Sequence, residues 1–264
     1  MKFQSVLPGL AIFASLLVIL PSCKKDGLGS SQLTLYLTDS PASFDALNIE
    51  ILRIEINTTD DLGEDNWQVV RFNNPGIYNL LDFTNGIDTM LSSSELKPGR
   101  LAQIRLILGP NNSIVVDGTL LPLPLSTPSI LNTGLKLNVH ADLKEGQNQQ
   151  LWIDFDAARS IIQTGTGEYK LKPVLRTFNN IHTGAMKGNI QPLQADAVLY
   201  AISGADTISA IPNRNTGNFL IRGLQPGSWK LLADAGNGYL DDSITGLQIH
   251  GGMTRILDTL TLRQ

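Results

Sequence analysis

The stretch LWIDFDA, residues 151–157, shows most clearly how this chain folds. Successive side chains of a β-strand point to opposite faces, so a period of two places alternate residues together. One face of this stretch then carries four apolar residues, and the other carries Trp152, Asp154 and Asp156. The pattern predicts a strand with its apolar face on a core.

The same alternation recurs along the chain, between clusters of Gly, Pro, Asn and Asp. It predicts strands at 32–38, 48–57, 67–72, 101–108, 114–116, 135–141, 169–178 and 254–262. In 48–57 the apolar phase changes between Ile51 and Leu52, which predicts a β-bulge. With 24 Gly, 13 Pro and only 17% charged residues, the fold class is all-β: two antiparallel β-sandwich-type domains in tandem.

Helix and edge positions are predicted at only a few places. Residues 78–83 and 87–91 are expected to form short helical turns around Asn85-Gly86. The segment LPLPL, residues 121–125, suits an edge strand or a polyproline-like stretch, because proline cannot donate a ladder hydrogen bond.

The first residues have the pattern of a secretory leader. Met1-Lys2 precedes an apolar run from Val6 to Leu20, and that run is short for a membrane span of about 20 apolar residues. Leu20-Pro21-Ser22-Cys23 resembles the bacterial lipobox, with Pro21 an unusual second residue. The resemblance implies cleavage after residue 22 and a lipid on the Cys23 thiol. Cys23 is the only cysteine of the 264 residues, so the chain forms no internal disulfide.

The residues after Cys23 bear on localisation. Residues 23–31 are expected to be the lipidated N-terminus and a polar tether. Lys24 stands where an Asp would resemble an inner-membrane retention signal, which favours the outer membrane of a Gram-negative cell. Lys24-Lys25-Asp26 partly resembles surface-export signals, so both the periplasmic and the outer face stay open.

A series of motifs within residues 32–180 resembles the domain of unknown function 4382. The motifs are LYLTDSPA (35–42), Trp67, YNLL (78–81), NG (85–86), PG (98–99), QIRL (103–106), GLKL (134–137), DFDAARSI (154–161) and YKLKPV (169–174). The resemblance covers residues 32–178 and implies a secreted or lipid-anchored envelope protein without an assigned activity.

Residues 185–264 resemble the prealbumin-like sandwich called carboxypeptidase-regulatory-like. The resemblance rests on GNI (188–190), AVLY (197–200), GNF (217–219), GLQPGSWK (223–230) and GY (238–239). Within it, Pro226-Gly227 predicts a tight turn that leaves Leu224 and Trp229 available to a core. Such domains commonly serve as spacers or adhesion modules.

Several activities have little support in the sequence. The net charge is −4 without a basic stripe, so no nucleic acid is expected as a partner. Ser94-Glu95-Leu96-Lys97 spells S-x-x-K, but no S-D-N or K-T-G triplet accompanies it, and we expect a turn there. His140, His182 and His250 are not spaced as metal ligands. No catalytic residue, metal or cofactor is predicted.

The face bearing Trp152, Asp154 and Asp156 is the best candidate site. Two carboxylates roughly 7 Å apart along a strand could bind Ca²⁺ or act as acid and base, although Ca²⁺ takes six to eight oxygen ligands. Structural ion pairs, with Arg159 and Arg105 as partners, are the favoured interpretation. Trp152, expected to be exposed, could instead stack on a sugar ring.

The leading hypothesis is a non-enzymatic envelope lipoprotein that acts as a binding or structural module. Its partners would be the lipid bilayer, through acylated Cys23, and a glycan or an envelope protein. Three alternatives remain: a carbohydrate-binding accessory protein of an uptake system, an enzyme that uses Asp154 and Asp156, and an adhesion or fimbria-related subunit.

Overall fold

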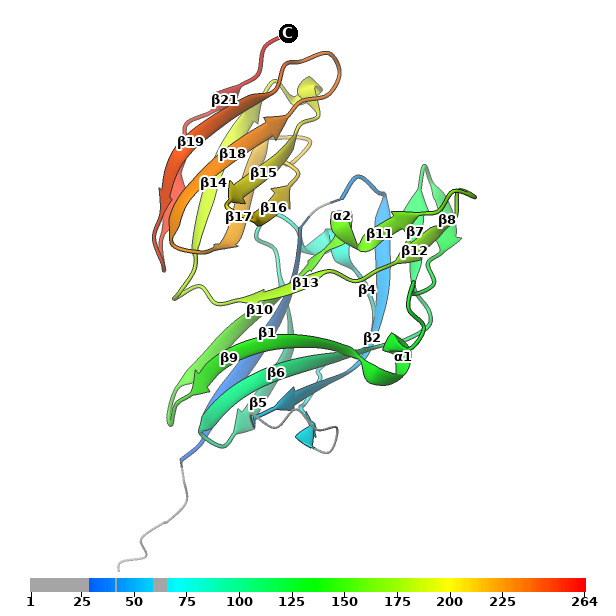
Figure 1. Ribbon diagram of the computed structural model, residues 1–264, viewed down its shortest axis with the longest axis vertical. Coiled ribbons are helices and arrows are strands. Elements are labelled where there is room, and N and C mark those ends of the chain that lie inside the picture. Colours follow the sequence, from blue (N-terminus) through cyan, green and yellow to red (C-terminus); the bar gives the residue numbers. More distant parts are fainter. Residues whose placement is uncertain (1–28, 41, 59–65) are drawn as a thin grey trace, which may run out of the picture.

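The computed structural model describes residues 29–40, 42–58 and 66–264. The predicted leader, Cys23 and the acidic loop at 60–65 lie outside these residues. The described chain is nearly all β, arranged as two sandwiches that follow one another along the long axis (Figure 1). We call residues 31–178 the N-terminal unit and residues 184–262 the C-terminal unit. The all-β fold class is therefore confirmed.

The N-terminal unit packs two main sheets against each other. The first sheet has the order β13-β10-β1-β5, formed by β13 (Leu175–Phe178), β10 (Asn148–Asp156), β1 (Ser31–Ser40) and β5 (Thr89–Leu96). The second has the order β8-β7-β2-β6-β9, formed by β8 (Thr119–Pro122), β7 (Ser113–Val116), β2 (Ala46–Asn57), β6 (Gly99–Leu108) and β9 (Leu135–Leu143). Two short strands, β3 (Gln68–Val69) and β4 (Gly76–Asn79), also pair with β2.

The apolar faces of these two sheets meet in one core, as in other sandwiches. Leu35 of β1, Ile54 of β2, Ile104 of β6 and Phe155 of β10 are all completely buried in it. The expected bulge in β2 is confirmed, because its register against β6 shifts between Ile51 and Arg53. Leu121 and Pro122 lie in β8, an edge strand that pairs with β7, as the prolines predicted.

The C-terminal unit has its own two sheets and its own core. One sheet has the order β17-β14-β20, formed by β17 (Asn218–Leu224), β14 (Gly184–Gln191) and β20 (Thr254–Ile256), and β21 (Leu260–Thr261) also pairs with β14. The other has the order β16-β15-β18-β19, formed by β16 (Asp206–Ala210), β15 (Val198–Ser203), β18 (Gly227–Asp234) and β19 (Asp242–Ile249). Leu224 and Trp229 are buried between the sheets, as expected.

Among the described residues most strand pairs are antiparallel, and three are parallel: β1 with β10, β14 with β20, and β14 with β21. The parallel pair β1–β10 forms the centre of the first sheet. Its register places Thr38 beside Asp154, which brings polar residues of two distant segments to the same end of the sheet.

Several predicted elements were wrong or misplaced. Residues 87–91 do not form a helical turn, because Thr89 begins the edge strand β5, which also contains Ser94, Glu95 and Leu96. The expected helical turn at 78–83 is confirmed only for the 3-10 helix η2 (Leu80–Phe83). Two unexpected four-residue helices occur, α1 (Ile130–Thr133) and α2 (Ala157–Ser160).

The predicted strand at 169–178 is divided. Pro173 has no backbone N–H to donate and separates β12 (Tyr169–Leu171) from β13. β12 pairs instead with β11 (Ile161–Gln163) in a small hairpin. A short 3-10 helix, η3 (Leu193–Ala195), follows β14 in the C-terminal unit.

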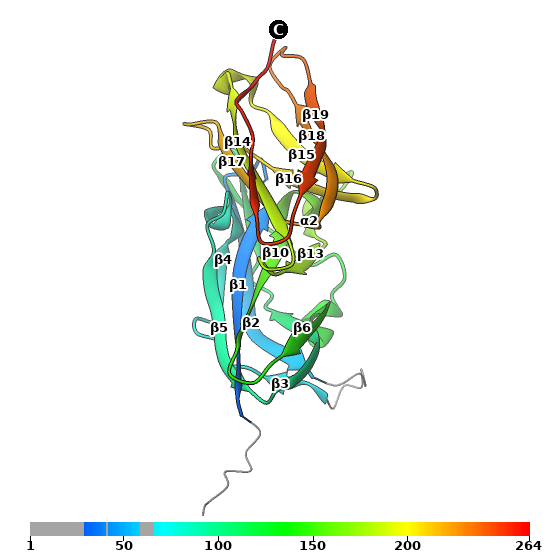
Figure 2. The same cartoon turned by 90° about the vertical axis from the view of Figure 1, so that its left-hand side faces the viewer.

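The two ends of the described chain lie at opposite ends of the molecule. β1 begins at the lower end of the N-terminal unit, and the C-terminus lies at the top of the C-terminal unit (Figures 1 and 2). The junction between the units therefore lies near the middle of the long axis.

None of the helices in the described part of the chain is long and apolar enough to cross a bilayer.

Candidate functional site

The face of β10 that bears Trp152, Asp154 and Asp156 does not face solvent. Trp152 is only 7% exposed, so its expected exposure was wrong. Its indole ring stacks between Tyr36 of β1 at 4.9 Å and Phe178 of β13 at 5.9 Å, measured between ring centroids. The alternation placed these side chains on the correct face, but the C-terminal unit covers that face.

Asp154 forms an ion pair with Arg176, which stands directly opposite it on β13. The Asp154 Oδ2 atom accepts from Nε of Arg176 at 2.8 Å and lies 2.5 Å from its Nη2. Asp154 itself is 3% exposed. A carboxylate buried this deeply is costly unless it is paired and hydrogen-bonded, and Arg176 meets both needs.

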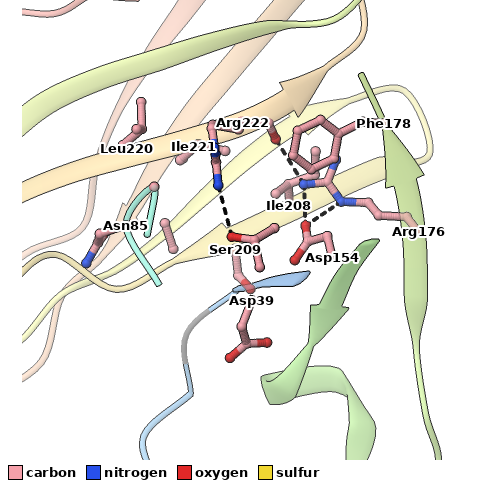
Figure 3. Close-up of a pocket in the computed structure, with 13 residues that line it drawn as sticks. Asp39, Asn85, Asp154, Arg176, Phe178, Ile208, Ser209, Leu220, Ile221 and Arg222 are labelled. Atoms are coloured by element: carbon pink, nitrogen blue, oxygen red, sulfur yellow. Dashed lines mark hydrogen bonds and ion pairs between the residues drawn. The ribbon is translucent and has the colours of Figure 1, made fainter. Parts of the chain in front are cut away.

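The same guanidinium reaches across to the C-terminal unit (Figure 3). Nη1 of Arg176 donates to the carbonyl oxygen of Gly223, and Nη2 donates to that of Arg222, each at 2.9 Å. Arg176 therefore joins a carboxylate on β10 to the backbone of β17. The predicted pairing of Arg105 with the aspartates is wrong, because Arg105 forms its ion pair with Glu55.

Arg222 of β17 makes the reciprocal connection. Its Nη1 donates to Oδ2 of Asp88 at 3.0 Å, and its Nη2 donates to Oγ1 of Thr38 at 3.1 Å. Its guanidinium carbon lies 5.8 Å from the ring centroid of Trp152, within the range of a cation–π contact. The Trp152 indole donates to the same Asp88 oxygen at 2.8 Å. We call Asp154, Arg176, Arg222, Asp88 and Trp152 the joint.

Two glycines allow the units to approach this closely. Gly223 has φ +72°, and a Cβ there would lie 2.7 Å from Nη1 of Arg176 and from the ring of Phe178. Gly86 has φ +88°, and a Cβ there would lie 2.4 Å from the Leu220 side chain. A larger residue at either position would require these neighbouring side chains to move and would also strain the backbone.

Asp156 lies at the C-terminal end of β10 and has a different role. Its Oδ1 accepts from the backbone N–H of Arg159 at 2.9 Å and so caps α2. The Arg159 guanidinium stands 3.8 Å away, so Arg159 is confirmed as a partner. Burial raises the pKa of Asp156, and the Arg159 backbone hydrogen bond partly opposes that rise.

The arrangement gives the two carboxylates structural partners. Asp154 is bound by Arg176, and Asp156 caps a helix. Within the described residues, no group of three or more His, Cys, Asp or Glu side chains is placed to hold a metal ion.

Sequence reasoning missed Arg176, Arg222 and Asp88. They come from strands or loops far apart in the chain, and Arg222 lies in the other unit. Neither their spacing nor their local pattern gives a signal, because strand pairing within the N-terminal unit and the packing of the two units bring them together.

Several cavities lie along the junction. The one in Figure 3 has a volume of about 20 Å³, enough for one water molecule. A larger cavity of about 420 Å³ is lined by Asp156, Arg159 and Arg176 from the N-terminal unit, and by residues of β16, β17 and β18. A third, of about 270 Å³, lies between α2 and the β15–β16 hairpin.

These features define a class: an all-β protein of two sandwiches, joined through a buried polar face. The profile of the family described as domain of unknown function (DUF4382) matches residues 30–173, more than half of the chain. The chain therefore belongs to this family.

A comparison with curated proteins finds no match. Among solved structures, the Bacillus anthracis TIE protein aligns with 89% of this chain at 11% identity and a TM-score of 0.23. The chain spans only 34% of that protein's length.

Two pilus proteins are also among the similar structures. GBS52, the minor pilin of Streptococcus agalactiae, aligns with 88% of this chain and 95% of its own, at 9% identity and a TM-score of 0.24. A C-terminal fragment of the pilus adhesin SpaC from Lactobacillus rhamnosus GG aligns with 88% of this chain and 97% of its own, at 12% identity and a TM-score of 0.23. At such scores these similarities carry no argument about function.

Proposed function

We propose that this protein is a non-enzymatic lipoprotein of the outer membrane, a two-unit module held off the bilayer by acylated Cys23 and a short tether. The strongest support comes from the contacts that the two carboxylates of β10 make. Asp154 and Asp156 were the strongest catalytic candidates, and both are buried in contacts that hold the structure together. Such contacts suit a structural or binding role.

The lipid anchor is supported by the leader, the lipobox-like residues before Cys23 and the polar residues 24–30. Two or three acyl chains give stable attachment, since each buried methylene adds about 0.8 kcal/mol. β1 begins at the end of the molecule opposite the C-terminal unit (Figure 1). A membrane anchor there would place the C-terminal unit farthest from the bilayer.

The joint supports a module that moves as one body. Arg176 and Arg222 each cross the junction, in opposite directions, and Asn85 adds a hydrogen bond to the carbonyl oxygen of Ile211 at 3.1 Å. A rigid connection would present the C-terminal unit to a partner at a fixed distance and orientation. This lowers the entropy lost on binding.

Metabolic labelling with palmitate tests the anchor. We expect the wild-type protein to incorporate label and to fractionate with outer membranes, and Cys23→Ala to lose both properties. Lys25→Ala is the matched control and should keep them. An unmodified sulfur at Cys23 with the leader still attached, seen by mass spectrometry, would contradict the proposal.

Asp156→Asn tests the proposal that the protein is not an enzyme. Asparagine keeps the oxygen that caps α2, so the variant should fold and accumulate normally. In a strain that lacks the wild-type gene, the variant should fully reverse any phenotype that the deletion causes. Failure to reverse that phenotype, at an unchanged protein level, would favour an enzyme that uses this carboxylate.

A further inference from the structure

We propose that the 270 Å³ cavity between α2 and the β15–β16 hairpin binds a small monoanion with an apolar body, such as an aryl carboxylate. This inference goes beyond the proposed function, because it concerns the folded units and does not depend on the lipid at Cys23. The cavity has a floor from the C-terminal unit and a roof from the N-terminal unit.

The floor is one face of the β15–β16 hairpin. Thr207, Ser209 and Ile211 alternate along the chain and therefore share a face, and all three line the cavity. Tyr200 stands directly opposite Ser209 on β15 and lines it too. The floor thus combines an aromatic ring, an aliphatic side chain and the hydroxyl groups of Tyr200 and Thr207.

Ser209 lines the cavity but offers no hydrogen bond to a ligand. Its Oγ is fully enclosed and has no hydrogen-bond partner within the described residues. A ligand in the cavity would therefore be recognised by the side chains of Arg159, Tyr200 and Thr207.

The charge of the lining selects an anion. Arg159 lines the cavity, whereas Asp and Glu are absent from its described lining. The Arg159 side chain is 61% exposed, and its Nη1 stands 3.8 Å from the Asp156 carboxylate, too far for a good hydrogen bond. A guanidinium has five N–H donors, so it can bind a ligand carboxylate in a bidentate manner.

The remaining lining sets the size and the apolar character of the ligand. Ala42 and Ala158 form part of the roof, and Val198 lies in the floor beside Tyr200. The volume of about 270 Å³ lies just below the usual range of ligand pockets, about 300–1,000 Å³. A single ring that carries one carboxylate fits this combination of a cation, apolar walls and hydroxyl groups.

Benzoate is a suitable probe, with benzamide as its neutral analogue and acetate as an anion without an apolar body. We expect benzoate to shift the backbone amide resonances of Arg159, Tyr200 and Ser209 saturably in the full chain. Benzamide and acetate should each bind about tenfold more weakly, because each lacks one of the two features that the cavity recognises.

Two variants and a control complete the test. Arg159→Gln should weaken benzoate binding about tenfold, and Val198→Phe should do the same by filling the cavity. Arg255→Gln changes an exposed arginine of β20 and should leave binding unchanged. Absence of saturable benzoate binding, or equal affinity in Arg159→Gln, would overturn the proposal, provided that each variant unfolds at the wild-type temperature.

Discussion

The two faces of β10 are equally buried but are built from different side chains. On one face Ile153 and Phe155 are completely buried in the apolar core of the N-terminal unit. On the other face Trp152 and Asp154 are 7% and 3% exposed, in a polar and aromatic joint with the C-terminal unit. Both faces are removed from water, one by the unit's own second sheet and the other by a neighbouring unit.

The difference concerns how each face is stabilised. The core face depends on apolar area and close packing, which tolerate many hydrophobic sequences. The joint depends on partners for each buried charge and donor, so removal of one partner leaves another group unsatisfied. Substitutions on the two faces should therefore change the free energy of unfolding by different amounts, and these changes should depend differently on pH.

The largest loss of stability is expected for a substitution on the core face. Phe155→Ala should lower the free energy of unfolding by about 3–5 kcal/mol, because it removes a fully buried ring and leaves a cavity. Urea denaturation followed by circular dichroism measures this. A loss below 1 kcal/mol would mean that Phe155 does not pack as described.

Arg176→Ala should cost about 3 kcal/mol, because Asp154 would lose its guanidinium partner at a buried position. The same variant removes the hydrogen bonds to Gly223 and Arg222. Arg53→Ala is the matched control. Arg53 pairs with Glu55 from a half-exposed position, and its loss should cost no more than about 1 kcal/mol. Equal costs for the two variants would contradict a special role for the joint.

Trp152→Phe should have a smaller effect, about 1 kcal/mol. The phenyl ring can still stack between Tyr36 and Phe178, whereas the indole hydrogen bond to Asp88 is lost. Asp88 keeps Arg222 as a partner. A cost as large as that of Phe155→Ala would show that the indole contributes more than this one hydrogen bond and the lost ring area.

The smallest expected effect is the pH dependence that Asp156 gives to the stability of the fold. Burial raises the pKa of Asp156 above its ordinary value, which is about 3.9. The folded state then binds this proton more tightly than the unfolded state. The contribution of Asp156 to stability therefore falls as pH rises from the ordinary pKa through the raised one.

Asp156→Asn removes this titration and keeps the helix cap. The stability of the variant minus that of the wild type should increase as pH rises through the same interval. Urea denaturation of both proteins at a series of pH values from about 3 to 7, a range that begins below the ordinary pKa of about 3.9, measures the difference. A difference that stays flat, or decreases with pH, would contradict the effect of burial.

Much of the fold could be predicted from sequence because most strands have one apolar face. The alternation at 32–38, 101–108 and 151–157 placed β1, β6 and β10 correctly. β5 was missed because it is an edge strand with the polar run Ser92–Ser94. An edge strand is held by backbone hydrogen bonds to one neighbour, so its side chains need not alternate.

The candidate site could be predicted only in part. Alternation gave the correct face for Trp152, Asp154 and Asp156, and Arg159 is a partner of Asp156. The environment of that face could not be predicted, since a polar face normally indicates solvent. Contacts with the other unit, such as those of Arg222 and the close approach at Gly223, reveal the buried joint.

The exposure of Trp152 to solvent tests the central claim most directly, because that claim places the polar face of β10 inside the junction. The protein can be labelled with 5-fluorotryptophan, and the Trp152 resonance can be assigned by its loss in Trp152→Phe. We predict that this resonance hardly shifts when H₂O is replaced by D₂O. A solvent isotope shift as large as that of free 5-fluorotryptophan would show that the face is open to water, and it would contradict the account.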